Sequence, residues 1–173
     1  VVAQIVTLVV QSRVGSLGSL EGRSFLAVTY LQTLARYLPL VLEFNPDLLT
    51  GIFQDFISNA GILNPNPFVR SQSAYLLLRV IRASGSKLNV FAVKYLKFIQ
   101  RFLEIDRSSV TEEVKAQLDS TYERLPSESG IIFSDVVNLY EGVGFIIGSS
   151  WFENSLKFLK FSLEPLQKNL RQC

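Results

Sequence analysis

The sequence predicts an all-α fold in which paired helices stack into an α-solenoid. Apolar residues recur at helical spacing along most of the 173 residues, and no segment alternates cleanly between apolar and polar residues as a strand would. Two corresponding helices begin about 43 residues apart, near Ser24 and Pro67, a period typical of helical-repeat proteins. An irregular helical bundle is the alternative.

The first two helices are bounded by turn-forming residues. A short apolar helix is expected over Val2–Gln11, closed by the Gly- and Ser-rich segment that follows it. A second helix is expected over Phe25–Leu38. It should end near Pro39, because proline cannot donate the next backbone hydrogen bond of a helix.

Two Asn-Pro pairs mark the starts of the next two helices. Asn45–Asp47 supply a cap, a first-turn proline and a favourable acid for a helix through about Ser58. Asn66–Pro67 repeat the same arrangement for a helix through about Ala83, which Gly85 stops. One start signal used twice is expected of a repeat protein.

The second half of the chain should contain three more helices and one insertion. Residues 106–130 form an acidic insertion within one repeat. The capping box at Ser150–Glu153 starts the last helix, and Pro165 should kink that helix or end its first part. The three helices are expected over Leu88–Glu104, Ile131–Ile147 and residues 151–170.

Composition argues against catalysis and against metal binding. Histidine is absent, Cys173 is the single cysteine, and no catalytic or phosphate-binding motif is present. We therefore expect no catalytic residues, no metal site and no cofactor. No uninterrupted apolar run reaches the roughly 18 residues of a membrane-spanning helix, so membrane insertion is not expected.

Charge is unevenly distributed, although the formal net charge is only +2. Residues 66–104 carry seven Lys and Arg against one acid, whereas residues 106–141 carry eight acids against three bases. This pattern predicts a surface with separate basic and acidic regions.

The segment NPNPFVRSQSAYLLLRVIRASG at residues 64–85 has the pattern that opens the second helix of a HEAT repeat. Pro67 presets the first turn, Val69 anchors the helix in the core, and Ala74 allows the paired helix to approach closely. Arg70 is expected to tie neighbouring turns together through hydrogen bonds. We therefore interpret Arg70 as structural.

A helical projection places a polar stripe beside the apolar face of this helix. The stripe consists of Gln72, Tyr75, Arg79 and Arg82. Arginine and tyrosine together suit contact with phosphate and stacking on nucleobases or on a peptide. An ordinary solvated helix surface would produce the same stripe, so both interpretations stay open.

The preceding helix carries a similar stripe, made of Thr29, Gln32, Thr33 and Arg36. Second helices of neighbouring repeats would align the two stripes on one wall of the solenoid. The candidate residues for contact with a partner are therefore Gln32, Arg36, Gln72, Tyr75, Arg79 and Arg82.

Four stretches carry a resemblance to a known family. They are VRSQSAYLLLRVIRASGSKLN (Val69–Asn89), FIQRFLEI (Phe98–Ile105), LYEGVGFIIGSS (Leu139–Ser150) and LEPLQKNL (Leu163–Leu170). On these residues the chain resembles the exportin-T family of tRNA export receptors, within the karyopherin-β superfamily. The similarity extends over nearly the whole chain apart from the acidic insertion.

The resemblance implies a superhelix of HEAT repeats that binds tRNA together with Ran-GTP in the nucleus and releases the tRNA in the cytoplasm. It also implies shuttling between nucleus and cytoplasm through contacts with nuclear pore proteins. Residues 1–173 would then be a single middle segment of a longer receptor, with about three and a half helix pairs. The main Ran contact of such receptors lies in amino-terminal repeats outside this segment.

Charge on the wall of second helices separates two binding hypotheses. A wall for tRNA should be basic across several repeats, whereas a wall for peptides alternates acids with apolar pockets. Here one repeat is basic, its predecessor is nearly neutral, and the next carries Asp135 and Glu141. A HEAT-repeat karyopherin for protein cargo, or a scaffold, is thus the alternative to a tRNA receptor, which the resemblance favours.

Overall fold

The structure, a computed structural model, describes residues 2–12, 24–90, 92–99, 133–149 and 152–171. Within these ranges all regular structure is helical, which confirms the predicted all-α class. The chain folds as two compact units, residues 1–87 (unit 1) and residues 88–173 (unit 2).

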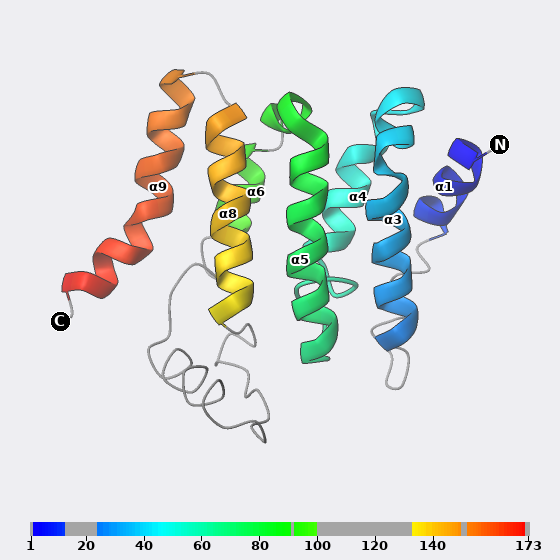
Figure 1. Cartoon of the computed structure of the whole chain (residues 1–173), viewed down its shortest axis with the longest axis horizontal. Coiled ribbons are helices and arrows are strands. Elements are labelled where there is room, and N and C mark those ends of the chain that lie inside the picture. The colour runs from blue at the N-terminus through cyan, green and yellow to red at the C-terminus, as the bar shows by residue number, and fades with distance from the viewer. Residues whose placement is uncertain (1, 13–23, 91, 100–132, 150–151, 172–173) are drawn as a thin grey trace. The chain divides into compact units, whose positions relative to one another are not determined.

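The described residues of unit 1 form four α-helices in two layers. Helices α3 and α5 lie side by side, α4 packs behind both of them, and α1 packs against α3 and α4 (Figure 1). Alternation between two layers is the arrangement of helix pairs in an α-solenoid, as predicted. The helices are α1 (Val2–Gln11), α3 (Ser24–Phe44), α4 (Leu48–Phe56) and α5 (Pro67–Ser84).

Aliphatic and aromatic side chains fill the space between the layers of unit 1. On α3 they recur three and four residues apart, which gives the helix one continuous apolar face. Fully burying a side chain of this kind contributes about 1.5–3 kcal/mol relative to leaving it in water. Members of this core are Leu31, Leu34 and Leu38 of α3, Ile52 and Phe56 of α4, and Leu77 and Ile81 of α5.

Helix α5 begins where the sequence predicts and ends within one residue of the prediction. Asn66 is its N-cap, Pro67 is its first residue, and the helix ends at Ser84. Gly85 follows with a φ of 52°, a backbone conformation that glycine adopts at much lower cost than other residues. Both ends of α5 are therefore set by local sequence.

Helix α3 continues past Pro39 to Phe44, so its predicted end was wrong. Leu38, Val41 and Leu42, on either side of the proline, are buried, and ending the helix would expose them. Pro39 itself is exposed.

Helix α4 begins at Leu48, so the cap predicted from Asn45 and Pro46 is not used as expected. Asp47 is the N-cap residue and makes no side-chain hydrogen bond to the helix. The backbone supplies the start instead, because the amide of Leu48 donates to the Asn45 carbonyl at 3.2 Å. The Asn-Pro pair forms a turn that leads into the helix.

Among the described helices, only α3 is long and apolar enough to cross a membrane. Half of its most apolar window is buried inside the protein. Its exposed positions include Gln32 and Arg36. These features are those of a core helix in a helical repeat.

A 3-10 helix, η1 (Gly85–Val90), separates α5 from α6 (Ala92–Ile99). The prediction of one continuous helix from Leu88 was therefore wrong at its start. Leu88 is buried in the 3-10 segment, and this tight turn lets the chain bury an apolar side chain before α6 begins. The predicted end of that helix lies outside the described residues.

Unit 2 contains α6, α8 (Phe133–Ser149) and α9 (Phe152–Arg171), and each of these helices packs against the other two. Helix α8 covers the described part of the predicted helix and ends two residues beyond its predicted end at Ile147, while the predicted start at Ile131 lies outside the described residues. Glycines inside α8 do not interrupt it, because its apolar side is held by burial. The buried residues include Leu96 and Ile99 of α6, and Leu139, Val143 and Ile146 of α8.

Helix α9 runs through Pro165 to Arg171. Figure 1 shows that α9 changes direction in its C-terminal part, so the chain bends there and the helix continues. This agrees with the first of the two outcomes predicted for Pro165. The predicted acidic insertion at residues 106–130, and Ser150 of the predicted capping box, lie outside the described residues.

Candidate nucleic-acid interface on helices α3 and α5

The start of α5 is tied to the start of α3 by one asparagine. The Asn66 side-chain oxygen accepts a hydrogen bond from the backbone amide of Phe68 at 2.9 Å, which caps the helix. Its side-chain nitrogen donates to the Ser24 hydroxyl at 3.2 Å. Asn66 therefore holds the N-terminal ends of the two neighbouring helices together.

Arg70 makes its hydrogen bonds inside the protein. Its Nη1 atom donates to the backbone carbonyl of Asn64 at 2.8 Å and to that of Pro65 at 2.9 Å. The buried Asn64 side chain in turn donates to the Asn59 carbonyl and accepts from the Asn66 amide. Arg70 thus secures the connection between α4 and α5.

The other motif residues lie where helix packing requires them. Val69 is fully buried in contact with Ala27 and Val28 of α3. Ala74 is also fully buried, and its small side chain permits close approach of a neighbouring helix. Pro67 occupies the first position of α5, where its missing amide hydrogen costs nothing.

Helices α3 and α5 present equivalent sides to α4. Tyr30 of α3 donates a hydrogen bond from its hydroxyl to the Asp55 carboxylate of α4. Ser73 of α5, which lies 43 positions after Tyr30, donates to the Phe56 carbonyl at the end of α4, with an oxygen–oxygen distance of 3.4 Å. Burial, together with the Asp55 carboxylate, raises the pKa of Tyr30. Because equivalent positions of α3 and α5 pack against α4, positions 43 residues apart on their outer sides are equivalent as well.

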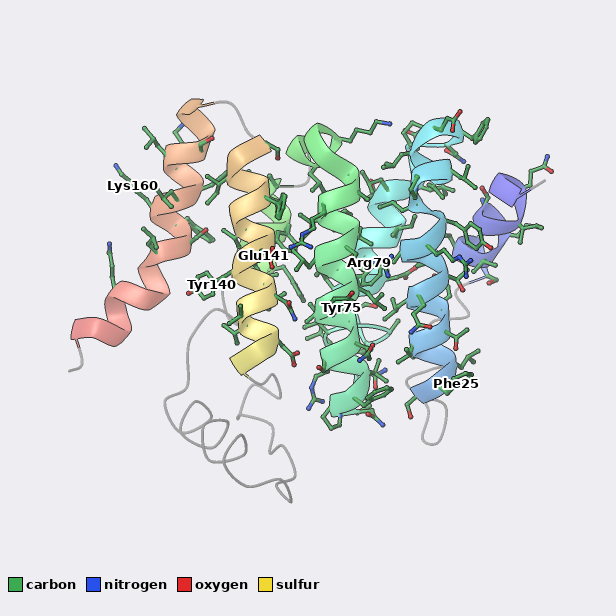
Figure 2. The ribbon with its side chains drawn as sticks, viewed as in Figure 1. Phe25, Tyr75, Arg79, Tyr140, Glu141 and Lys160 are labelled. Atoms are coloured by element: carbon green, nitrogen blue, oxygen red, sulfur yellow. The ribbon has the colours of Figure 1, made fainter. Side chains whose placement is uncertain are left out.

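The two predicted polar stripes consequently form one surface, the α3–α5 face. Tyr75 is half exposed, Arg79 and Arg82 are exposed, and Gln72 is partly buried. Figure 2 shows Tyr75 and Arg79 on α5 beside α3. We define the α3–α5 face as Thr29, Gln32 and Arg36 of α3, all exposed, with Gln72, Tyr75, Arg79 and Arg82 of α5.

Thr33, the remaining residue of the predicted α3 stripe, does not belong to this face. Its hydroxyl donates to the Thr29 carbonyl at 2.8 Å, one turn earlier in the same helix. Thr33 is also only partly exposed. Its hydrogen-bonding capacity is used by the helix backbone.

The α3–α5 face is cationic. Arg36, Arg79 and Arg82 are exposed on it, α5 contains no acidic residue, and the single acid of α3 is Glu43 in its last turn. Neither Arg36 nor Arg79 makes a hydrogen bond or ion pair with another described residue. Such guanidinium groups can form bidentate hydrogen bonds with phosphate oxygens.

Lys87 behaves differently from these arginines. Its ammonium group donates to the Leu42 carbonyl in the last turn of α3 at 2.8 Å. A cation at this position also interacts favourably with the negative end of the helix dipole. Lys87, like Arg70, is thus used to stabilise the fold.

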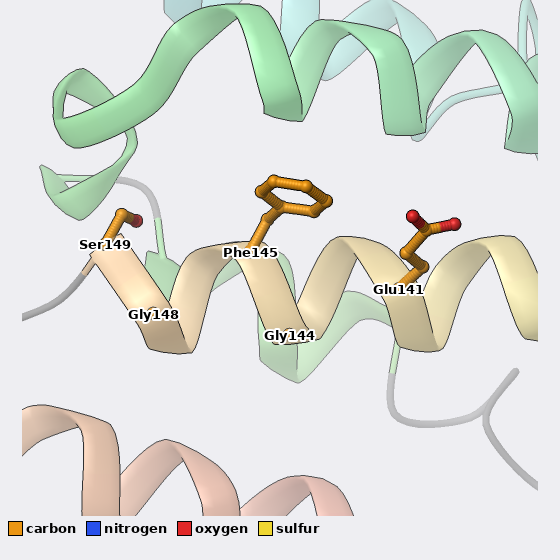
Figure 3. A pocket seen from close by; sticks show the side chains of 5 residues that line it. All are labelled: Glu141, Gly144, Phe145, Gly148 and Ser149. Carbon is orange, nitrogen blue, oxygen red and sulfur yellow. The ribbon is translucent and has the colours of Figure 1, made fainter.

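Helix α8 in unit 2 presents a different surface. Glu141, Gly144, Phe145, Gly148 and Ser149 line a hollow of about 600 Å³ on one side of it (Figure 3). The sequence placed Asp135 on the same wall as Glu141, but Asp135 is only 4% exposed. That expectation was wrong, because Asp135 lies on the buried side of the first turn of α8.

Sequence reasoning missed two exposed aromatic residues at the edge of the α3–α5 face. Phe25 and Phe68 are both exposed, although neither was a candidate. The available signal was the 43-residue offset that relates α3 to α5, because it places one phenylalanine over the other. Among the described residues there is no cluster of three or more His, Cys, Asp or Glu that could hold a metal ion.

Comparison with known proteins identifies the family. A sequence profile of the Exportin-T family matches residues 2–173. The chain belongs to the exportin-T family. Three similar relatives are all called Exportin-T. That of Dictyostelium discoideum is 26% identical over 132 residues, that of Arabidopsis thaliana 25% over 142, and that of Kluyveromyces lactis 27% over 147.

The matches cover most of this chain but little of each exportin-T relative. They extend over 76%, 81% and 84% of the chain, and over 10%, 13% and 12% of the relatives, respectively. The chain therefore spans about a tenth of the length of these curated relatives. No solved structure matches the chain.

Proposed function

We propose that this chain is part of a nuclear export receptor that binds tRNA together with Ran-GTP and carries it from nucleus to cytoplasm. Membership of the exportin-T family carries this proposal. Residues 1–173 would be a middle segment of the receptor, and its Ran contacts would lie mainly in other repeats. Contacts with nuclear pore proteins would allow the receptor to shuttle between the two compartments.

The α3–α5 face is the part of this segment that we assign to tRNA. Its guanidinium groups supply charge for phosphates, while the amide and phenol groups of Gln32, Gln72 and Tyr75 can hydrogen-bond to ribose or phosphate oxygens. These contacts would recognise the shape and the charge of the RNA backbone, and they would depend little on the base sequence. The chain has no role in catalysis under this proposal, and it needs no cofactor.

A protein partner is a second candidate, favoured by the hollow on α8. Exposed Phe145 and Glu141 combine an apolar surface with a carboxylate there, which suits a peptide better than a polyanion. A karyopherin for protein cargo, or a scaffold, would use such a surface in place of the α3–α5 face.

A filter-binding titration of the intact protein with tRNA, with and without Ran-GTP, tests the proposal. Arg79→Glu with Arg82→Glu should weaken Ran-GTP-dependent tRNA binding at least tenfold, because two phosphate contacts become repulsive. The matched control is Lys157→Glu with Lys160→Glu, which makes the same charge change at the same spacing on exposed positions of α9.

Three outcomes separate the function from the site. No tRNA binding by the wild-type protein under any Ran-GTP condition would refute the proposed function. Undiminished binding by the Arg79/Arg82 variant would remove the α3–α5 face from the contact while leaving the receptor function in place. An equal loss in the α9 control would mean that only net charge matters.

A further inference from the structure

Two exposed phenylalanines beside the α3–α5 face have no role in the phosphate contacts. Phe25 is 81% exposed and Phe68 is 57% exposed, although phenylalanine is among the residues most often buried in proteins. They occupy equivalent positions at the starts of α3 and α5. The hydrogen bond between Asn66 and Ser24 holds these two helix ends together, so the phenyl groups lie at the same end of the face.

The exposed side chains of both helices change in the same order along their length. Phenyl groups come first at Phe25 and Phe68, neutral hydrogen-bonding groups follow, and the guanidinium groups of Arg36 and Arg79 come last. About 11 residues separate the phenyl from the guanidinium position on each helix, which is about 16 Å along the helix axis. Figure 2 shows Phe25 near the start of α3, with Tyr75 and Arg79 further along α5.

We propose that Phe25 and Phe68 form a stacking platform for unpaired nucleobases of the RNA whose phosphates contact Arg36 and Arg79. Proteins that bind single-stranded nucleic acids combine cationic side chains for the backbone with exposed aromatic rings for the bases. Every base has an apolar π-face, so such a platform accepts unpaired nucleotides with little regard to sequence. A fully paired duplex cannot use it, because its bases are stacked on one another.

The charge of the surrounding surface selects RNA over an apolar peptide as the occupant. The phenyl groups continue directly into a surface with three exposed arginines, and α5 offers no carboxylate to repel a phosphate. The half-exposed Tyr75 places a third aromatic ring between Phe68 and Arg79. This inference rests on the proposed function of the α3–α5 face.

Fluorescence-anisotropy titrations of the intact protein with two RNA probes test the platform. One probe is a blunt-ended hairpin, and the other is the same hairpin with an unpaired uridine extension. Wild-type protein should bind the extended hairpin more tightly, by about tenfold for each base stacked, within the roughly 5- to 150-fold range of base–aromatic stacking. Phe25→Ala with Phe68→Ala should abolish this gain and leave the affinity for the blunt hairpin unchanged.

The control is Leu156→Ala with Leu159→Ala, which removes exposed apolar side chains from α9 and should keep the gain. The platform is overturned if the gain survives in the phenylalanine variant, or if that variant loses affinity equally for both hairpins. It is also overturned if an apolar leucine-rich peptide binds the wild type and not the variant while the hairpins do not compete. If neither hairpin binds the wild type in the presence of Ran-GTP while tRNA does, the platform fails and the proposed function stands; if tRNA does not bind either, both fail.

Discussion

The salt dependence of RNA binding gives the sharpest test of the α3–α5 face. Changing both Arg36 and Arg79 to glutamine removes two positive charges and keeps side chains that can hydrogen-bond. Both arginines are exposed and have no hydrogen bond or ion pair with another described residue. The substitutions should therefore change the free energy of unfolding by less than about 0.5 kcal/mol.

The expected magnitude follows from counterion release. Each phosphate neutralised by a protein cation contributes about −0.9 to the slope of log affinity against log salt concentration on a duplex. Loss of the Arg36 and Arg79 contacts should therefore make that slope shallower by about 1.8. Between 50 and 200 mM salt, the affinity of the wild-type protein should then fall about tenfold more than that of the variant.

The assay is a series of tRNA titrations at four or five salt concentrations, with Ran-GTP held constant. The control variant, Lys157→Gln with Lys160→Gln, removes the same charge from exposed positions on α9 and should keep the wild-type slope. A slope unchanged by the loss of Arg36 and Arg79 would contradict direct phosphate contact. Equal changes in both variants would attribute the effect to the overall field of the protein.

Two further predictions concern the framework that holds this face. Replacing Asn66 by Ala should lower the free energy of unfolding in urea by about 1–2 kcal/mol, because the cap of α5 and the bond to Ser24 are both lost; an Asp substitution, which keeps a capping oxygen, should recover part of this. Gly61→Ala should cost about 3 kcal/mol or more, because its Cβ would lie 2.1 Å from the Phe56 carbonyl oxygen. Gly144→Ala, which meets nothing within 4 Å in α8, should instead be neutral or stabilise by up to about 1 kcal/mol. Similar losses for the two glycine variants would contradict the steric reasoning.

Sequence was a good guide wherever structure is decided locally. Asn66 and Pro67 predict the start of α5 because a capping side chain and a preset φ act on adjacent residues. The polar stripe of α5 was predictable for a similar reason, since helical geometry alone separates Tyr75 and Arg79 from the buried side.

Tertiary packing decided the features that the sequence did not predict. A proline usually ends a helix, but burial of Val41 and Leu42 keeps α3 intact beyond Pro39. Asp135 looked like a wall residue because helical spacing says which residues share a side but not which side packs against a neighbour. Phe25 and Phe68 were missed for a different reason: helical spacing places each on the same side as its polar stripe, but phenylalanine is usually buried and was therefore not counted with the exposed residues.

Comparing positions 43 residues apart in α3 and α5 shows which residues serve packing and which are free to contact a partner. At most buried positions the two helices differ, as Leu31 of α3 corresponds to Ala74 of α5, and the neighbouring side chains adjust to fill the space; Leu34 and Leu77 are the matching buried pair. At two exposed positions they carry the same residue, phenylalanine near the start and arginine at Arg36 and Arg79. Packing can tolerate many combinations of apolar residues, but it does not require matching exposed rings and charges. A partner that extends across both helices would require them, which is why the exposed residues of α3 and α5 are best treated as one surface.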